Sequence, residues 1–349
     1  MKCTIQNIAD HLGLSRNTVS KALKNSSEVS ENTRNLVIKT ASKLGYKNAT
    51  FATPVIPASE TDSNGTILFL TRTYASDSEF WTTVLRGIES ILSNANYHLA
   101  ISIMSDSDLK QLNFPQTISD SSFKGIILVE ICDKVVCDAL SQFNLPIVSV
   151  DMPNVPFEEL NGIDVVTMES KKNLKKIINQ LIEKGAESFG FVGDLYSPNV
   201  SRGFQERYNA LSECLAEHQL PLNQKNCLLH QTPEDFRNFQ TTVNNLQAMI
   251  SLPDVFICGN DWTAIQLIYA LQFLGFQIPK DICVVGFDNI PAASRISPSL
   301  TTISTPQKYL GIAAARQILE RIQHPNCPHV FCQYETELII RNSTNIISF

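Results

Sequence analysis

The residues near the N-terminus that are best suited to chemistry are those that can read DNA bases. In the segment LSRNTVSKAL, Arg16 and Asn17 stand at the start of an expected helix, and Lys21 follows one turn later on the same face. An Arg side chain can bind both acceptors of guanine, and an Asn side chain can bind the donor and the acceptor of adenine. Val19 and Ala22 fall on the opposite, apolar face. This pattern predicts a helix that enters the major groove of DNA.

Several further residues stand where short helices are expected to begin. Hydroxyl groups and backbone N–H groups at such positions can hold phosphates. The candidates for contacts with the DNA backbone are Thr4, Ser15, Thr18, Ser30, Thr33 and Arg34.

Charge is distributed unevenly along the chain. The 349 residues carry a formal net charge of −6. Residues 1–50 hold eight Lys or Arg and three Asp or Glu, a net charge of +5, so the other residues carry −11. A basic end on an acidic body predicts a polyanionic partner for the N-terminal end only. The alternative is a small helical interaction module with a solvated basic face.

A second group of polar and aromatic residues follows apolar, strand-like runs. These are Phe80 and Trp81 after TILFLT, Asp151 after PIVSV, Arg202 and Arg207 after SFGFVG, Asn260 and Asp261 after DVFICG, and Asp288 at the end of VVGFD. Planar polar side chains can grip adjacent hydroxyls, and an aromatic ring can cover the C–H face of a sugar. The pattern therefore predicts a sugar or polyol site.

Some members of this group have simpler interpretations. Asp261 could cap the helix that follows it, and Arg202 could be a solvated surface charge. One of Phe80 and Trp81 is expected to lie in the core.

The DNA-reading residues need a small helical scaffold. Helical spacing predicts helices over about 4–12 and 15–24, with Gly13 at the turn between them, and a third helix over 31–44. The residues expected to form the core of this unit are Ile8, Leu12, Val19, Leu23, Leu36, Val37 and Leu44.

The remaining chain has a different texture. Residues 46–64 have the proline-containing, small and polar composition of a linker. From Thr66 strand-like runs alternate with amphipathic helices, up to a final strand near 330–341, which predicts doubly wound parallel sheets with ligands at the carboxyl ends of their strands. We therefore expect a helix-turn-helix headpiece over 1–47, a hinge or linker over 48–64, and an α/β core for effector binding and dimerisation over 65–349.

Four segments resemble the lactose-repressor/galactose-repressor family of bacterial regulators. They are IQNIADHLGLSRNTVSKAL, GNDWTAIQLIYALQFLGFQIPKDICVVGFDN, SPSLTTISTPQKYLG and LIIRNST, and the resemblance covers nearly the whole chain. It implies a homodimer on a palindromic operator and a core of two subdomains folded like a periplasmic sugar-binding protein.

The resemblance also implies roles for individual residues. Arg16, Asn17 and Lys21 match the family's base-reading positions. In the effector cleft, Arg207, Asn260 and Asp288 match the principal polar contacts, Asp151 a secondary one, and Phe80 and Trp81 the aromatic or apolar wall.

The hinge departs from the family pattern. Family members follow the headpiece with a short hinge helix whose leucine wedges into the minor groove, a known way to kink DNA. Here Val55 occupies that position between Pro54 and Pro57, and proline breaks helical hydrogen bonding. Whether this hinge forms a helix stays open.

Together these features predict a sequence-specific DNA-binding repressor whose operator affinity is controlled by a small, sugar-like effector. One alternative replaces the effector by a protein corepressor such as a phosphorylated carrier protein. Another is a sugar-processing enzyme, but the chain has no GxSxG, P-loop, HExxH or strand-linked GxGxxG motif, and we expect no enzymatic activity.

Assembly and location follow from the remaining features. The chain ends at Phe349, five residues after RNST, without room for the heptad tail of tetrameric relatives, so we expect a homodimer. No apolar run approaches the about 20 residues of a membrane span, no signal peptide opens the chain, and the nine scattered cysteines form no CxxC pair, so we expect a cytoplasmic protein without a membrane partner. The segment HPNCPHVFC holds imidazoles and thiols, His324, Cys327, His329 and Cys332, but at no usual zinc spacing. We expect no metal and no cofactor.

Overall fold

The computed structural model describes residues 4–23, 63–72, 78–115, 123–195, 201–230 and 238–344, together with 29–30, 33–34, 36–37, 40–41 and 118. The chain divides into two compact units, Met1–Asp62 and Ser63–Phe349. None of the described helices combines the length and the apolar composition needed to cross a membrane.

The first unit holds helices α1 (Ile5–Leu12) and α2 (Arg16–Leu23). Gly13 ends α1 with a φ of 62°, a left-handed conformation that glycine adopts without a steric penalty, which confirms the predicted turn.

The apolar core of the first unit agrees with the sequence at most positions. Its buried members include Ile8, Val19 and Val37. Leu36 was expected there as well, but 51% of its surface is exposed, so that prediction was wrong. Neighbouring Val37 takes the inward position of this segment. Leu44 lies outside the described residues.

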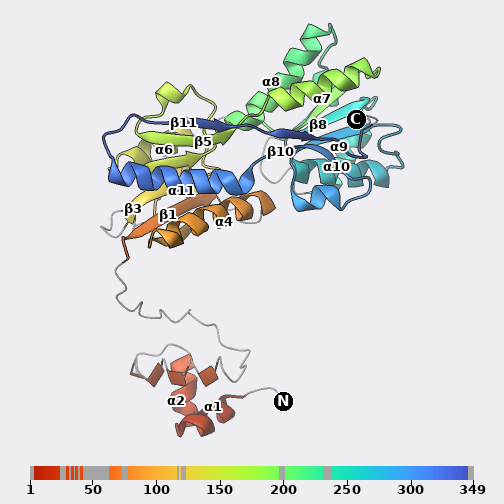
Figure 1. Cartoon of the computed structure of the whole chain (residues 1–349). Coiled ribbons are helices and arrows are strands. Elements are labelled where there is room, and N and C mark those ends of the chain that lie inside the picture. The colour runs from red at the N-terminus through yellow and green to blue at the C-terminus, as the bar shows by residue number, and fades with distance from the viewer. Residues whose placement is uncertain are drawn as a thin grey trace. The chain divides into compact units, whose positions relative to one another are not determined.

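The second unit contains two six-stranded sheets (Figure 1). The first sheet has the order β11-β5-β4-β3-β1-β2. Its strands are β1 (Thr66–Arg72), β2 (His98–Met104), β3 (Phe123–Val129), β4 (Ile147–Val150), β5 (Ile163–Met168) and β11 (Phe331–Tyr334). Helices α4 (Glu79–Asn94) and α11 (Gln307–Gln323) lie side by side on one face, and α5 (Asp106–Gln111) and α6 (Lys134–Ser141) pack on the other.

The second sheet has the order β12-β10-β9-β8-β6-β7. Its strands are β6 (Phe189–Asp194), β7 (Leu228–His230), β8 (Val255–Cys258), β9 (Cys283–Asp288), β10 (Thr301–Ser304) and β12 (Glu337–Ile339). Its helices are α7 (Lys172–Glu183), α8 (Arg202–Glu217), α9 (Phe239–Ala248) and α10 (Asp261–Phe273). Short 3-10 turns cover Phe157–Glu159, Gln224–Asn226 and Pro291–Ser294.

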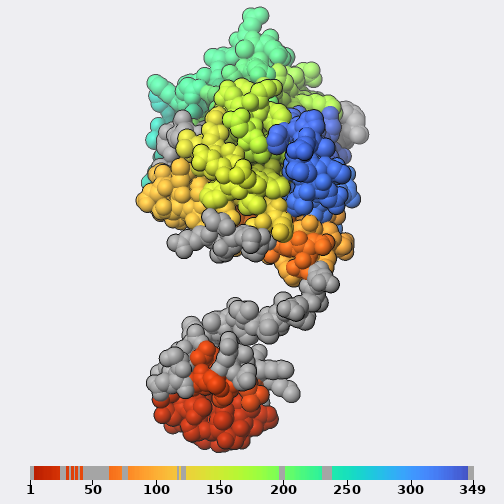
Figure 2. Space-filling model, turned by 90° about the vertical axis from the view of Figure 1, so that its left-hand side faces the viewer, coloured from red at the N-terminus to blue at the C-terminus, as the bar shows by residue number. Residues whose placement is uncertain are grey.

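Strand pairing confirms the predicted parallel α/β architecture, with one exception. Every described strand pair is parallel except β10 with β12, which is antiparallel. The prediction of a single final strand near 330–341 was wrong. Residues 331–334 pair with β5 in the first sheet, whereas residues 337–339 pair with β10 in the second. On the face shown in Figure 2, blue C-terminal residues accordingly lie beside the yellow-green residues of the first sheet.

Two glycines allow α4 and α11 to pack backbone to backbone. A Cβ atom on Gly87 would overlap the carbonyl oxygen of Lys308, and one on Gly311 would overlap that of Val84. Any larger residue at either position would push the two helices apart.

The segment HPNCPHVFC surrounds a buried ion pair. Arg321 of α11 donates hydrogen bonds to the carboxylate of Asp164 from Nε, at 3.0 Å, and from Nη2, at 2.8 Å. The same guanidinium donates to carbonyl oxygens within residues 325–328, and Nδ1 of His329 lies 3.3 Å from Oδ1 of Asp164. This segment therefore satisfies the donors of a buried cation. Among the described residues, His, Cys, Asp and Glu side chains form no group of three arranged to hold a metal ion.

Candidate DNA-binding and effector sites

The predicted base-reading residues occupy one helix of the first unit. Arg16 and Asn17 are exposed in the first turn of α2, and Lys21 is half-buried one turn later. Val19 and Ala22 of the same helix are buried in the core. The separation of polar and apolar faces predicted from the sequence is therefore present in α2.

The candidates for phosphate contacts fix the starts of the helices. The hydroxyl oxygens of Thr4, Ser15 and Ser30 each accept a hydrogen bond from the backbone N–H three residues later, at 3.3, 3.0 and 3.4 Å. The hydroxyls of Thr18 and Thr33 lie 2.8 Å from those of Ser15 and Ser30. The starts at Ser15 and Ser30 thus each present a hydroxyl pair beside their first N–H groups, whereas the hydroxyl of Thr4 donates to Oδ1 of Asn7 at 2.6 Å.

Two predicted contacts differ from this pattern. Arg34 does not point freely outward, because its Nη2 donates to the carbonyl oxygen of Val29 at 3.1 Å. Val55, the expected wedge residue, lies outside the described residues.

In the second unit, charged residues gather at the carboxyl edge of the first sheet. Register pairs Thr71 with Val129 and Val129 with Val150, so the residues that follow, Arg72, Glu130 and Asp151, are neighbours along this edge. Glu130 and Asp151 have φ values of 57° and 72°, in the left-handed region that side chains other than glycine seldom adopt. Such strained residues cluster at functional sites.

The second sheet contributes a matching edge. Asp194 ends β6, Asn260 follows β8, and Asp288 ends β9 with a φ of 114°. The backbone of Asp288 is held there because its carbonyl oxygen accepts hydrogen bonds from Nε2 of Gln307 at 2.7 Å and from Oγ1 of Thr305 at 3.2 Å. No described residue donates a hydrogen bond to its carboxylate.

Arg207 of α8 provides a buried cation to these carboxylates. Only 3% of its surface is exposed, its Nη1 donates to the carbonyl oxygen of Gly259 at 2.7 Å, and its guanidinium carbon lies 3.7 Å from the ring centroid of Phe287. Its Nε has no hydrogen-bond partner among the described residues. A buried donor without a partner is costly, so this nitrogen is available to an acceptor group of a ligand.

Burial dominates the electrostatics of this group. It lowers the pKa of Arg207, and the opposing charges of Asp288 and Asp151 are the largest influences that raise it. Burial also raises the pKa of Asp288 well above its ordinary value and that of Asp151 above its own. Glu130 reaches a pKa of about 7, mainly through burial, with Arg72 acting in the opposite direction.

Asn260, and not Asp261, caps the helix that follows these two residues. Oδ1 of Asn260 caps α10 by accepting from the backbone N–H of Thr263 at 2.8 Å. Asp261 is completely buried and accepts from the N–H of Ile290 at 2.9 Å and from Oγ1 of Thr302 at 2.5 Å. The prediction that Asp261 caps the helix was therefore wrong, because this carboxylate ties α10 to the turn that follows Asp288.

Arg202 is not the solvated surface charge that was expected. Its Nε pairs with Glu206 at 2.8 Å, and its guanidinium lies 5.2 Å from the ring centroid of Phe331 in the first sheet. Its backbone N–H donates to the carbonyl oxygen of Met152 at 3.0 Å. The start of α8 thus contacts the edge of the first sheet beside Asp151.

The two aromatic candidates separate into core and edge, as the sequence suggested. Phe80 is buried in the core, with 5% of its surface exposed. Trp81 is half-buried and packs edge-to-face on Phe80 with ring centroids 4.5 Å apart.

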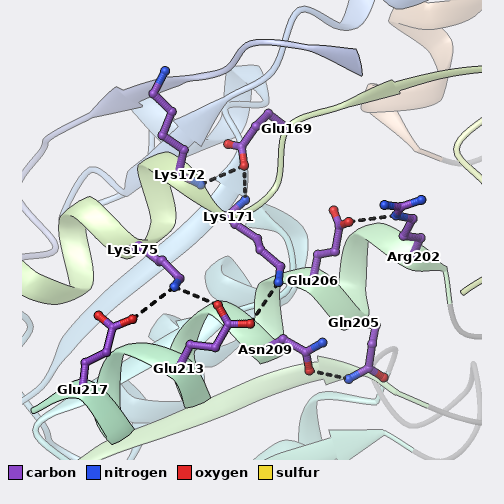
Figure 3. A network of polar contacts seen from close by, with 10 residues as sticks. All are labelled: Glu169, Lys171, Lys172, Lys175, Arg202, Gln205, Glu206, Asn209, Glu213 and Glu217. Carbon is purple, nitrogen blue, oxygen red and sulfur yellow. Dashed lines mark hydrogen bonds and ion pairs between the residues drawn. The ribbon is translucent and has the colours of Figure 1, made fainter. Parts of the chain in front are cut away.

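Ion pairs between α7 and α8 fix the helix that carries Arg207 (Figure 3). Glu213 on the outer face of α8 accepts from Lys171 at 3.0 Å and pairs with Lys175 at 2.7 Å. Lys175 also pairs with Glu217 at 3.5 Å. With this face tied to α7, the opposite face of α8 holds Arg207 in the interior.

The sequence interpretation missed three charged residues that the structure places at these edges, namely Arg72, Glu130 and Asp194. Each ends or directly follows an apolar strand-like run, the same signal that identified Asp151 and Asp288. Applying that signal to every run would have found them.

Comparisons with known proteins agree with this architecture. Residues 4–48 match the family described as bacterial regulatory proteins, lacI family, and residues 178–344 match the periplasmic binding protein-like domain. The ribose operon repressor of Haemophilus influenzae is 27% identical over 344 residues, which cover 97% of this chain and 98% of the relative.

Two solved structures show the same fold. A LacI family transcriptional regulator from Enterococcus faecium with bound ribose has a TM-score of 0.66 and 24% identity, covering 81% of this chain and all of that one. The lac repressor dimer bound to operator and an anti-inducer has a TM-score of 0.67 and 19% identity, covering 99% of both chains.

These findings define a bacterial regulatory protein built from a helix-turn-helix headpiece and a periplasmic-binding-protein-like core. The headpiece is of the lacI type, and the domain that follows it is periplasmic binding protein-like.

Proposed function

We propose that this protein is a sequence-specific transcriptional repressor whose operator affinity is controlled by a small, sugar-like effector. The observation that carries the proposal is that one chain combines a lacI-type headpiece with Arg207, a buried cation of α8 whose Nε has no hydrogen-bond partner among the described residues. In this proposal residues 1–47 bind DNA, residues 48–64 form the hinge or linker between the two units, and residues 65–349 bind the effector and dimerise.

DNA reading is assigned to the exposed start of α2. Arg16, Asn17 and Lys21 contact bases in the major groove, because the second helix of a helix-turn-helix lies in that groove with its N-terminal residues at the base edges. The residues assigned to phosphates or to the adjoining groove are Thr4, Ser15, Thr18, Ser30, Thr33, Arg34 and Val55. No chemical reaction is assigned to the protein.

The effector is assigned to the strand-end residues. Arg207 and Asp288 supply opposite charges that can grip neighbouring hydroxyls, and the amide N–H group of Asn260 is available because its oxygen caps α10. Asp151 lies beside them, Trp81 supplies an aromatic surface, and Phe80 supports Trp81 from the core. The name of the ribose operon repressor supports a sugar as the ligand class.

The partner of the second unit is proposed to be a second copy of this chain. On α10, Trp262, Tyr269 and Phe273 share one helical face and are 40%, 44% and 69% exposed. Phe239 of α9 packs against Phe273 with ring centroids 5.9 Å apart. Exposed aromatic faces of this kind mark protein interfaces. A dimer that binds operator DNA works in the cytoplasm.

The test begins with selection of DNA from a random library by the full-length protein. We expect a palindromic sequence. Arg16→Ala and Asn17→Ala should each lose about 1–3 kcal/mol of operator affinity, about 5- to 150-fold, and relax the preference at one base position of each half-site.

Arg295→Ala, an exposed arginine of the second unit, is the control and should bind as the wild type does. Selection of no sequence, or wild-type affinity and preference in both headpiece variants, would refute the DNA-binding assignment.

A further inference from the structure

The inference concerns the charge of the effector and rests on the proposed function. Glu130 and Asp151 follow the paired residues Val129 and Val150, so the two residues are neighbours across one strand spacing, about 4.8 Å. The charge of Asp151 raises the pKa of Glu130, and the charges of both residues raise the pKa of Asp288.

The cations nearest to these two carboxylates make their closest polar contacts with other groups. Arg72, the cation nearest in register to Glu130, forms its ion pair with Asp106 at 2.8 Å. Asp288 and Asp151 attract the charge of Arg207, but its Nη1 donates a hydrogen bond to the carbonyl oxygen of Gly259. No described Lys or Arg forms an ion pair with Glu130 or Asp151.

The surroundings of Glu130 are suited to a cation. Carboxylates this close cannot all be ionised in a buried site unless a positive charge joins them. Arg207, which is 3% exposed and has an unpartnered Nε, marks the same group of residues as a ligand site independently of the carboxylates.

We propose that the effector is an amino sugar whose ammonium group lies between Glu130 and Asp151 while its hydroxyls contact Arg207, Asn260 and Asp288. The ammonium would form the ion pairs with Glu130 and Asp151 that no described Lys or Arg forms. Sugar phosphates and uronic acids would add negative charge to the same site and be excluded. Neutral parent sugars would bind more weakly, because they leave the carboxylates unpaired.

The experiment compares matched compounds on the full-length protein by thermal shift and isothermal titration at pH 7. The set contains glucosamine, galactosamine and mannosamine, their parent hexoses, their N-acetyl forms, the hexose 6-phosphates and the uronic acids. We expect at least one amine to bind at least tenfold more tightly than its parent hexose and its N-acetyl form, with no stabilisation by phosphates or uronic acids.

Glu130→Gln keeps the size of the side chain and removes its charge. It should abolish the preference for the amine over its parent hexose, whereas Glu183→Gln, an exposed carboxylate at the end of α7, should keep it. If Glu130→Gln unfolds the protein, Asp151→Asn provides the same comparison.

The proposal is overturned if a hexose or N-acetyl form binds as tightly as its amine, if a phosphate or uronic acid binds, or if no amine in the set binds. A neutral or anionic sugar that binds and alters operator affinity would overturn the amine assignment and leave the proposed function intact. Loss of operator binding in the wild type would instead count against the proposed function.

Discussion

Replacement of Asp288 by Asn tests whether this residue serves the ligand or the fold. Its carboxyl group is half-buried and is attracted by the charge of Arg207, and no described residue donates a hydrogen bond to it. Its main-chain position does not depend on the side chain, because Gln307 and Thr305 hold its carbonyl oxygen. Asn also tolerates a positive φ better than most residues. The substitution should therefore remove charge and leave the backbone unchanged.

The expected effect on stability depends on pH in a defined direction. The folded-state pKa of Asp288 is raised above its ordinary value of 3.8, so the folded protein binds more protons than the unfolded chain in the window between the two values. Stability falls as pH rises through that window, and the cost of the buried carboxylate is complete above the folded pKa. Asn resembles the protonated carboxyl group, so the variant should match the wild type near pH 4 and exceed it at pH 8 by about 1–3 kcal/mol, the penalty of an unsatisfied buried group.

Urea unfolding of the full-length protein at both pH values provides the measurement, with fluorescence of Trp81 and Trp262 as the probe. Asp254→Asn is the control of opposite sign, because that carboxylate accepts hydrogen bonds from the N–H groups of Glu187 and Ser188, which lower its pKa. The control variant should be less stable than the wild type at pH 8. If Asp288→Asn is also less stable there, Asp288 is the structural counter-ion of Arg207 and its assignment to the effector loses its support.

Two further predictions concern the core and the assembly. Arg321→Met should lower the free energy of urea unfolding at pH 7 by about 3–5 kcal/mol, because it leaves the buried carboxylate of Asp164 without its cation. Arg316→Met, an exposed change on the same helix, should change this free energy by no more than about 0.5 kcal/mol. Equal effects of the two substitutions would contradict this view. Phe273→Lys should raise the dimer dissociation constant at least tenfold in sedimentation equilibrium, while Val135→Lys on α6 should not; an unchanged constant would move the interface away from α10.

Much of the fold could be predicted from the sequence because local patterns carried it. The apolar runs TILFLT, DVFICG and VVGFD located β1, β8 and β9 close to their observed bounds, and helical spacing located α1 and α2. Helices α5, α6 and α9 were not predicted, because six to ten residues give a weak periodic signal. The prediction of one final strand was wrong because residues 331–334 and 337–339 pair with different sheets. This pairing depends on strands far away in the sequence, which residues 331–339 do not reveal by themselves.

The sequence by itself determined that a DNA-reading helix precedes an α/β core, that Asp151 follows a strand of that core and that Asp288 ends one. Strand ends and helix starts are local properties that periodicity and residue type encode. Only the tertiary structure decided which of these polar residues share surroundings. It placed Glu130 beside Asp151 through the register of β3 and β4, buried Arg207 through the packing of α8, and turned Asp261 inward. Burial and the proximity of charges set the pKa values and unmet hydrogen bonds of the site, and both depend on contacts between residues far apart in the chain.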